Sequence, residues 1–363
     1  MKKRVIKNQE YDEYWKLTLE YSDIYGVPFN RVLSEIINYI DDNESVRTEG
    51  INSKQYKELQ NIIENIFHKK DSASTRKSIN QFLKLGFINN YCMSYHRLAK
   101  DFLSENDNRK KKAIYSQILY ENASFGRSVT KESNTNEISF LIKTLEACET
   151  INKEELLAIM YINTEEKDQK YLTKTELKEL VEEKTNLIRK SGKESKKYNQ
   201  RNYLFNAVCS NLTGVYTNNN ILSITPLSED EKKTKTRDSY LQRIYKTQLM
   251  EESKEVYSVD KEICVLEKLA YPVLIASHIK PYRDCDEKEE FDVNNGLLLS
   301  KNLDSLFDLG YITFDENGNI IASRQLDEKV ALNVNKYKLD ESIYNYERHK
   351  YMEYHREYVF RGV

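Results

Sequence analysis

The scarcity of chain breakers constrains this sequence more than any other feature. Ten glycines and four prolines are spread over 363 residues, so long stretches contain nothing that would interrupt a helix. Apolar residues recur at three- and four-residue spacing over 14–41 and 53–67, and Ile63 and Phe67 would share one helix face. We therefore expect the first half of the chain to be built mainly of helices.

The bulk composition is that of a soluble globular protein. Hydrophobic residues make up 39% and charged residues 31%, and the length suggests two or three domains. No apolar run is long enough to span a bilayer, and no signal-peptide stretch follows the basic start. The five cysteines are odd in number, widely spread and without a C-x-x-C pair. These features predict a cytoplasmic protein with reduced thiols, no membrane partner and no structural zinc.

The expected fold class is α+β and mainly α. A Ser/Gly/Lys-rich stretch over 190–197 predicts a domain boundary. We expect a mainly helical region over 1–195, a second domain over 196–340 and a closing helix over 341–363. In the second domain, apolar runs and turn signals predict the order strand, loop, strand, helix and hairpin between residues 273 and 323.

Positive charge is unevenly distributed, although the net charge is only -2. Thirteen Lys/Arg stand against five Asp/Glu over 68–131, so a local basic surface is expected. Within it, 72–86 predicts a short capped helix that fits the recognition helix of a winged helix-turn-helix within 72–131; an ordinary surface helix is the alternative. The side chains expected to face outward and contact DNA are Arg76, Lys77, Asn80, Gln81 and Lys84, with Lys110 and Lys111 on a second basic helix.

The residues that point to chemistry lie between 274 and 323. His278 ends an apolar strand, Asn295 begins an Asn-Gly turn, and Asp304 follows on a helix. Phosphodiester hydrolysis needs a base that takes a proton from water, and an imidazole does this at neutral pH. It also uses a hard divalent cation, for which carboxylates are natural ligands. An amide side chain can hold the histidine or its loop in place.

Three blocks in this region resemble the HNH nucleases, which have a ββα-metal core. They read Ala-Ser-His-Ile-Lys-Pro-Tyr over 276–282, Asn-Gly-Leu-Leu-Leu over 295–299, and Asp-Ser-Leu-Phe-Asp-Leu-Gly over 304–310. The resemblance covers 274–323 and is closest to the subgroup found in bacterial type II restriction endonucleases. It implies a helical DNA-recognition region followed by a C-terminal HNH nuclease domain.

The resemblance implies a role for each matching residue. His278 would be the general base, and Asn295 would orient the base and its loop. Asp304 would be a metal ligand, with Asp308 as a second ligand or a local cap. Ser277 stands where many HNH enzymes have a metal-binding aspartate, so a contact there would be weak or pass through water. The implied metal is Mg²⁺ or Mn²⁺, and no zinc-binding cysteine pair is present.

Basic residues beside the motif are candidates for holding DNA. Lys280 and Arg283 would contact phosphate, or would only solvate the rim of the site. The expected function is that of a type II-like restriction endonuclease that cuts double-stranded DNA. A homodimer would suit palindromic sites, and a cognate DNA methyltransferase would be expected in the same system. Two alternatives remain: a modification-dependent defence nuclease, and a catalytically inactive DNA-binding regulator with an HNH fold.

Overall fold

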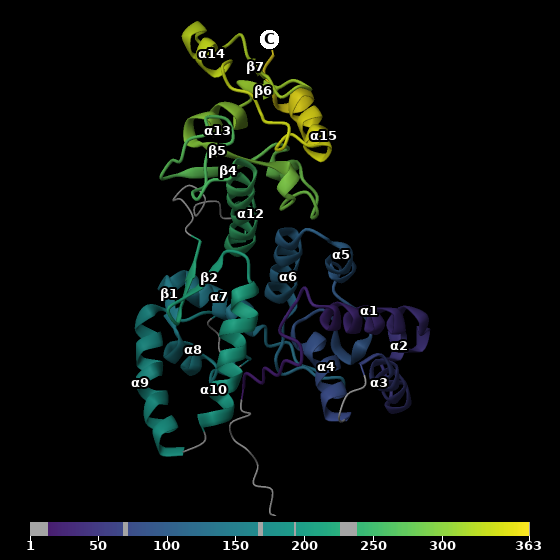
Figure 1. Ribbon diagram of the computed structural model, residues 1–363. Helices are drawn as coiled ribbons and strands as arrows, with labels where there is room; N and C mark the ends of the chain where they lie inside the picture. The colour runs from purple at the N-terminus through teal and green to yellow at the C-terminus, as the bar shows by residue number, and fades with distance from the viewer. Residues whose placement is uncertain (1–13, 68–71, 166–169, 192–193, 226–237, 363) are drawn as a thin grey trace, which may run out of the picture. The chain divides into compact units, whose positions relative to one another are not determined.

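The structure, a computed structural model, describes residues 14–67, 72–165, 170–191, 194–225 and 238–362 (Figure 1). It is mainly helical, as the low number of chain breakers predicts. The chain divides into two compact units, residues 1–225 and 226–363. The division therefore falls after Thr225 and not in the stretch 190–197, of which residues 192 and 193 lie outside the described residues.

The first unit combines helices with one small antiparallel sheet, of strand order β1-β3-β2. Residues 215–224 belong to this unit because β3 pairs with β1, with Ile151 opposite Leu222. The strands are β1 (Thr150–Asn152), β2 (Val215–Asn218) and β3 (Ile221–Ile224). The helices are α1 (Val27–Asp42), α2 (Glu44–Glu49), α3 (Ser53–Phe67), α4 (Ser72–Lys84), α5 (Ala99–Ser104), α6 (Asn108–Asn122), α7 (Glu137–Cys148), α8 (Lys153–Ile159), α9 (Lys174–Ser191) and α10 (Glu194–Tyr203).

Two predictions for the first unit need correction. The helix expected over 14–41 begins only at Val27, since Pro28 occupies the first turn and Gly26 precedes it in extended conformation. A winged helix is not shown, because the described residues between 72 and 131 form helices, short turns and isolated bridges but no strand. None of the described helices is long and apolar enough to cross a membrane.

The second unit has the predicted order of strand, loop, strand, helix and hairpin. The two strands of its first hairpin pair antiparallel, with Leu274 opposite Ser300 and His278 opposite Gly296. The closing helix is also present, although it starts at Tyr346 and not at 341. The elements are α12 (Ser239–Tyr257), β4 (Leu274–His278), β5 (Gly296–Ser300), α13 (Lys301–Asp308), β6 (Ile312–Phe314), β7 (Ile320–Ala322), α14 (Glu328–Val334), α15 (Tyr346–Tyr354) and the π-helical segment η7 (His355–Val359).

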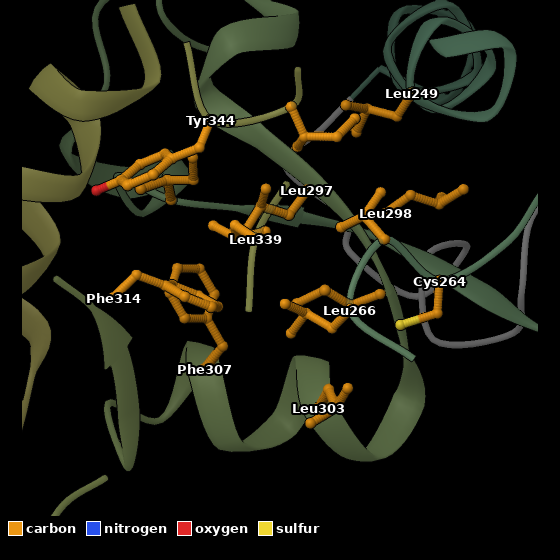
Figure 2. Close-up of a cluster of buried hydrophobic side chains, with 14 of the residues drawn as sticks. Leu249, Cys264, Leu266, Leu297, Leu298, Leu303, Phe307, Phe314, Leu339 and Tyr344 are labelled. Atoms are coloured by element: carbon orange, nitrogen blue, oxygen red, sulfur yellow. The ribbon is translucent and has the colours of Figure 1, made fainter. Parts of the chain in front are cut away.

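The core of the second unit lies around β5. Every residue of this strand is buried, because both α12 and α13 pack against it. Figure 2 shows Leu303 and Phe307 of α13 among the side chains of this core, near Leu266 and Phe314. Burial of these large apolar side chains stabilises the helix on the sheet. His278, at the end of β4, is thereby set on a rigid support.

A buried histidine connects the C-terminal segment to α13. The ring of His355 is stacked on Phe307, with the ring centres 4.0 Å apart. Its Nε2 lies 3.1 Å from the carbonyl oxygen of Phe307, and its Nδ1 lies 2.9 Å from the hydroxyl of Thr313. Burial in these surroundings lowers the pKa of His355 to about 4. His355 is therefore a neutral structural residue at physiological pH.

This histidine makes stability depend on pH. The unfolded chain binds the proton with a pKa of about 6.5, whereas the folded chain does so near 4, so the stabilisation is present above pH 6.5 and is lost as the pH falls towards 4. We expect about 2 kcal/mol of unfolding free energy to be lost between pH 7 and pH 5 through this group. Urea unfolding at both pH values, with His355→Gln beside the wild type, measures it. An equal pH dependence in the two proteins would contradict the assignment.

Candidate active site

His278 is held from three sides. Its imidazole is stacked on the ring of Tyr245 from α12, with ring centres 4.6 Å apart and 21° between the planes. The ring of Tyr282 meets it edge-on at 5.7 Å. Its Nε2 lies 2.9 Å from the carbonyl oxygen of Glu290. A carbonyl only accepts, so Nε2 carries the proton of the neutral ring and Nδ1 has the lone pair that can take one from water.

Asn295 fixes the loop between β4 and β5. Its side chain is completely buried. Its Oδ1 accepts from the backbone N–H of Lys280 at 2.7 Å, and its Nδ2 donates to the carbonyl oxygens of Lys280 and Glu289, both at 3.2 Å. The same Nδ2 lies 3.2 Å from the sulfur of Cys285. One amide thus connects both ends of the loop that follows His278. Glu289 is the neighbour of Glu290, whose carbonyl oxygen binds the imidazole.

The backbone at Asn295 is equally constrained. Its carbonyl oxygen accepts from the N–H of Ile279 and from the hydroxyl of Tyr245, both at 3.0 Å. The next residue must be glycine, because a Cβ on Gly296 would collide with the Tyr245 hydroxyl. Nothing in the sequence around Tyr245 indicates this contact, so Tyr245 was missed by sequence reasoning.

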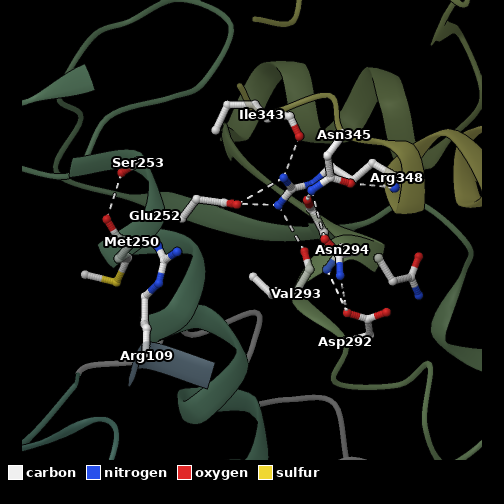
Figure 3. A network of polar contacts seen from close by, with 12 residues as sticks. Arg109, Met250, Glu252, Ser253, Asp292, Val293, Asn294, Ile343, Asn345 and Arg348 are labelled. Atoms are coloured by element: carbon white, nitrogen blue, oxygen red, sulfur yellow. Dashed lines mark hydrogen bonds and ion pairs between the residues drawn. The ribbon is translucent and has the colours of Figure 1, made fainter. Parts of the chain in front are cut away.

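A buried ion pair also supports the backbone around Asn295 (Figure 3). The guanidinium of Arg348, in α15, is fully buried and makes two charge-assisted bonds to Glu252, at 2.6 and 3.1 Å. It also donates to the carbonyl oxygens of Val293, Gly296 and Ile343. Val293 and Gly296 flank Asn295, so this network holds the turn that presents it.

The residues predicted to bind metal differ in their surroundings. Asp304 lies in the first turn of α13 and is half-buried, whereas Asp308, at the end of that helix, is exposed. Ser277 is buried and its hydroxyl has no hydrogen-bond partner in the described residues. No three His, Cys, Asp or Glu side chains in the described part of the chain lie close enough together to hold an ion. Asp304 and Ser277 each offer an oxygen atom, the type of ligand that a hard divalent cation prefers.

Comparison with known proteins agrees with this geometry. Residues 264–315 match the family model of the HNH endonucleases. The chain contains an HNH endonuclease domain. The matched span includes β4, β5 and α13, and with them His278, Asn295 and Asp304. A search of the curated proteins finds no match.

Three of the side chains predicted to contact DNA do not face outward. Gln81 is fully buried, and its amide bonds the backbone of Glu20 and Tyr21 at 2.8–2.9 Å. Lys84 is buried and donates to the carbonyl oxygens of Lys16 and Phe125. The outward orientation predicted for these two was wrong, because residues 16–21 lie over that side of α4. Lys111 is also buried, with its Nζ 4.5 Å from the ring centre of Phe102.

The other predicted DNA contacts remain at the surface to different degrees. Arg76 and Lys77 are exposed on α4, and Lys110 is half-buried on α6. Asn80 is half-buried and its Oδ1 accepts from the backbone N–H of Val129 at 2.9 Å. In the HNH domain, the ammonium of Lys280 is 2.6 Å from Glu289, whereas the side chain of Arg283 is 83% exposed. Arg76, Lys77 and Arg283 are therefore the candidates best placed to meet phosphate.

Proposed function

We propose that this protein is a sequence-specific endonuclease of the type II restriction kind, with His278 as its general base. The HNH domain indicates a nuclease that acts on DNA with a divalent metal. The observation that supports the proposal most directly is the hydrogen bond between His278 Nε2 and the Glu290 carbonyl, at 2.9 Å. It selects the ring tautomer whose Nδ1 can accept a proton.

The proposed reaction is hydrolysis of one phosphodiester bond in each strand. His278 Nδ1 takes a proton from water while the water oxygen attacks phosphorus and the bond to the 3′ oxygen breaks. The 3′ oxygen takes a proton from a second water molecule, and His278 returns its proton to the solvent. The products carry a 5′-phosphate and a 3′-hydroxyl. Asn295 holds the His278 loop during this step through its bonds to Lys280 and Glu289. Asp304 and Ser277 would hold a divalent cation, which when bound would supply positive charge to stabilise the negative charge of the phosphate.

The first unit is proposed to recognise the DNA sequence. Arg76 and Lys77 on α4 would supply salt-dependent contacts to phosphate, and Arg283 would do so beside the cutting centre. We propose Mg²⁺ or Mn²⁺ as the metal, a homodimer for palindromic sites, and a cognate methyltransferase that protects host DNA in the same cytoplasm. The DNA contacts of Arg76 and Lys77 are testable by their salt dependence.

Digestion of unmethylated phage DNA by the purified full chain, with Mg²⁺, Mn²⁺ or EDTA, tests the proposal. Discrete fragments that require the metal would support a restriction endonuclease. Cutting of modified DNA alone would instead establish a modification-dependent nuclease. Binding without cutting of either substrate would establish a DNA-binding regulator.

Asp304→Ala tests the metal assignment. We expect the cleavage rate at low Mg²⁺ to fall by at least about 100-fold, since the metal contributes several kcal/mol to catalysis, and to recover in part at high Mg²⁺ or with Mn²⁺. Asp308→Ala tests the second predicted ligand, which is exposed at the end of the same helix, and should lose less. Titration of the rate against metal concentration measures both. An unchanged metal requirement in Asp304→Ala would remove this residue from the site.

A further inference from the structure

We infer that Tyr245 is a positioning residue for the cutting centre, holding the imidazole of His278 and the backbone of Asn295 with one side chain. The inference rests on the function proposed above, and it concerns a residue that lies outside the matched span 264–315. Tyr245 is in α12 and is 2% exposed. It therefore acts from within the core and does not meet substrate.

The ring of Tyr245 fixes the plane of the imidazole. The hydrogen bond from Nε2 to Glu290 fixes the position of one ring atom of His278, but it does not by itself prevent rotation of the ring about the Cβ–Cγ bond. Stacking at 4.6 Å and 21° removes this rotation, and the edge of Tyr282 closes the other direction. The direction of the Nδ1 lone pair is thereby defined, which is what proton transfer from a bound water requires.

The hydroxyl of Tyr245 fixes the second element of the site. It donates to the Asn295 carbonyl at 3.0 Å, beside the N–H of Ile279, which binds the same oxygen. Glycine at 296 is needed for this approach. Because ring and hydroxyl belong to one rigid group, a shift of His278 relative to Asn295 would have to break one of the two contacts. Tyr245 thus maintains their relative position.

The experiment compares Tyr245→Met, which removes the ring but fills its space, with Tyr245→Phe, which removes only the hydroxyl. The matched controls are Tyr257→Met and Tyr257→Phe, since Tyr257 is also in α12 and donates to a backbone carbonyl, that of Val265, at 3.1 Å. Cleavage is measured as kcat and KM for DNA. In parallel, NMR of the His278 ring protons, assigned with His278→Gln, reports the upfield shift that a stacked aromatic ring produces.

We expect Tyr245→Met to lower kcat about 100-fold with KM unchanged, because a displaced base loses alignment but not DNA affinity. We expect Tyr245→Phe to keep the upfield shift and to lose about three- to tenfold in kcat, the effect of one hydrogen bond. Both Tyr257 variants should cleave as the wild type does.

Two results would overturn the inference. One is a His278 ring shift that persists in Tyr245→Met; the other is a kcat in the Tyr245 variants that equals that of the Tyr257 variants. If Tyr245→Met does not fold, the kcat of Tyr245→Phe decides. If the wild type cuts no DNA, the proposed function fails, while the ring shift still decides whether Tyr245 holds His278.

Discussion

His278→Ala should lose nearly all DNA cleavage while the protein stays folded. We expect the single-turnover rate at saturating DNA to fall by about 10²- to 10⁴-fold, the contribution of a positioned general base. The reason is specific to this ring: its Nε2 is held by the Glu290 carbonyl, so in the proposed mechanism Nδ1 accepts the proton. The cleavage rate with Mg²⁺ is measured on a DNA substrate that the wild type cuts. The urea unfolding midpoint shows whether the variant stays folded.

The matched control is His349→Ala. This histidine lies in the same unit and is also stacked on a tyrosine, Tyr344, with ring centres 3.9 Å apart, but it is outside the HNH span. Its replacement should leave the cleavage rate within a few-fold of wild type. Equal rates for His278→Ala and wild type would show that another group activates water, and a similar loss in both variants would indicate a general effect of lost stacking.

Arg348→Met should destabilise the second unit by about 3–5 kcal/mol, the cost of leaving one member of a buried ion pair without its partner. The variant leaves Glu252 unpaired, with a side chain only 13% exposed, and removes the donor from three carbonyl oxygens. Chemical unfolding monitored by circular dichroism measures the change.

Lys350→Met is the control for this prediction. Lys350 lies two residues after Arg348. Both side chains of its ion pair with Glu347 are about half exposed. Exposed pairs contribute about 0–1 kcal/mol, so this variant should unfold close to wild type. The double variant Arg348→Met with Glu252→Gln should recover part of the loss, because it removes the unpaired charge. If the double variant recovers no stability, the hydrogen bonds to the three carbonyl oxygens, and not the ion pair, account for most of the lost unfolding free energy.

The sequence predicted the parts of the site that depend on neighbours along the chain. A strand ending at His278, a turn at Asn295 and a helix bearing Asp304 follow from local periodicity and turn signals, and the structure has them in that order. Tyr245 and Arg348 could not be found in this way. Tyr245 lies 50 residues before Asn295, and Arg348 lies 52 residues after Gly296, and only the folded chain brings them together.

The errors on α4 have a different physical origin. Ile79, Phe82 and Leu83 of α4 lie in the core, whereas helical periodicity leaves Gln81 and Lys84 on the other face. That face is covered by an irregular segment, residues 16–21, and the Gln81 amide and the Lys84 ammonium form hydrogen bonds with its backbone. A polar pattern therefore shows which side chains can meet water, but it does not show whether another part of the chain takes the water's place.

The ion pair between Glu252 and Arg348 also determines which piece of this protein can be exchanged. Glu252 lies before the matched span and Arg348 after it, yet their contact supports the turn in the middle of that span. A chimera that receives residues 264–315 alone would import His278 and Asn295 without Tyr245, Glu252 or Arg348. The piece that keeps these contacts together is the second unit, residues 226–363, and recombination that preserves them should join chains outside those limits.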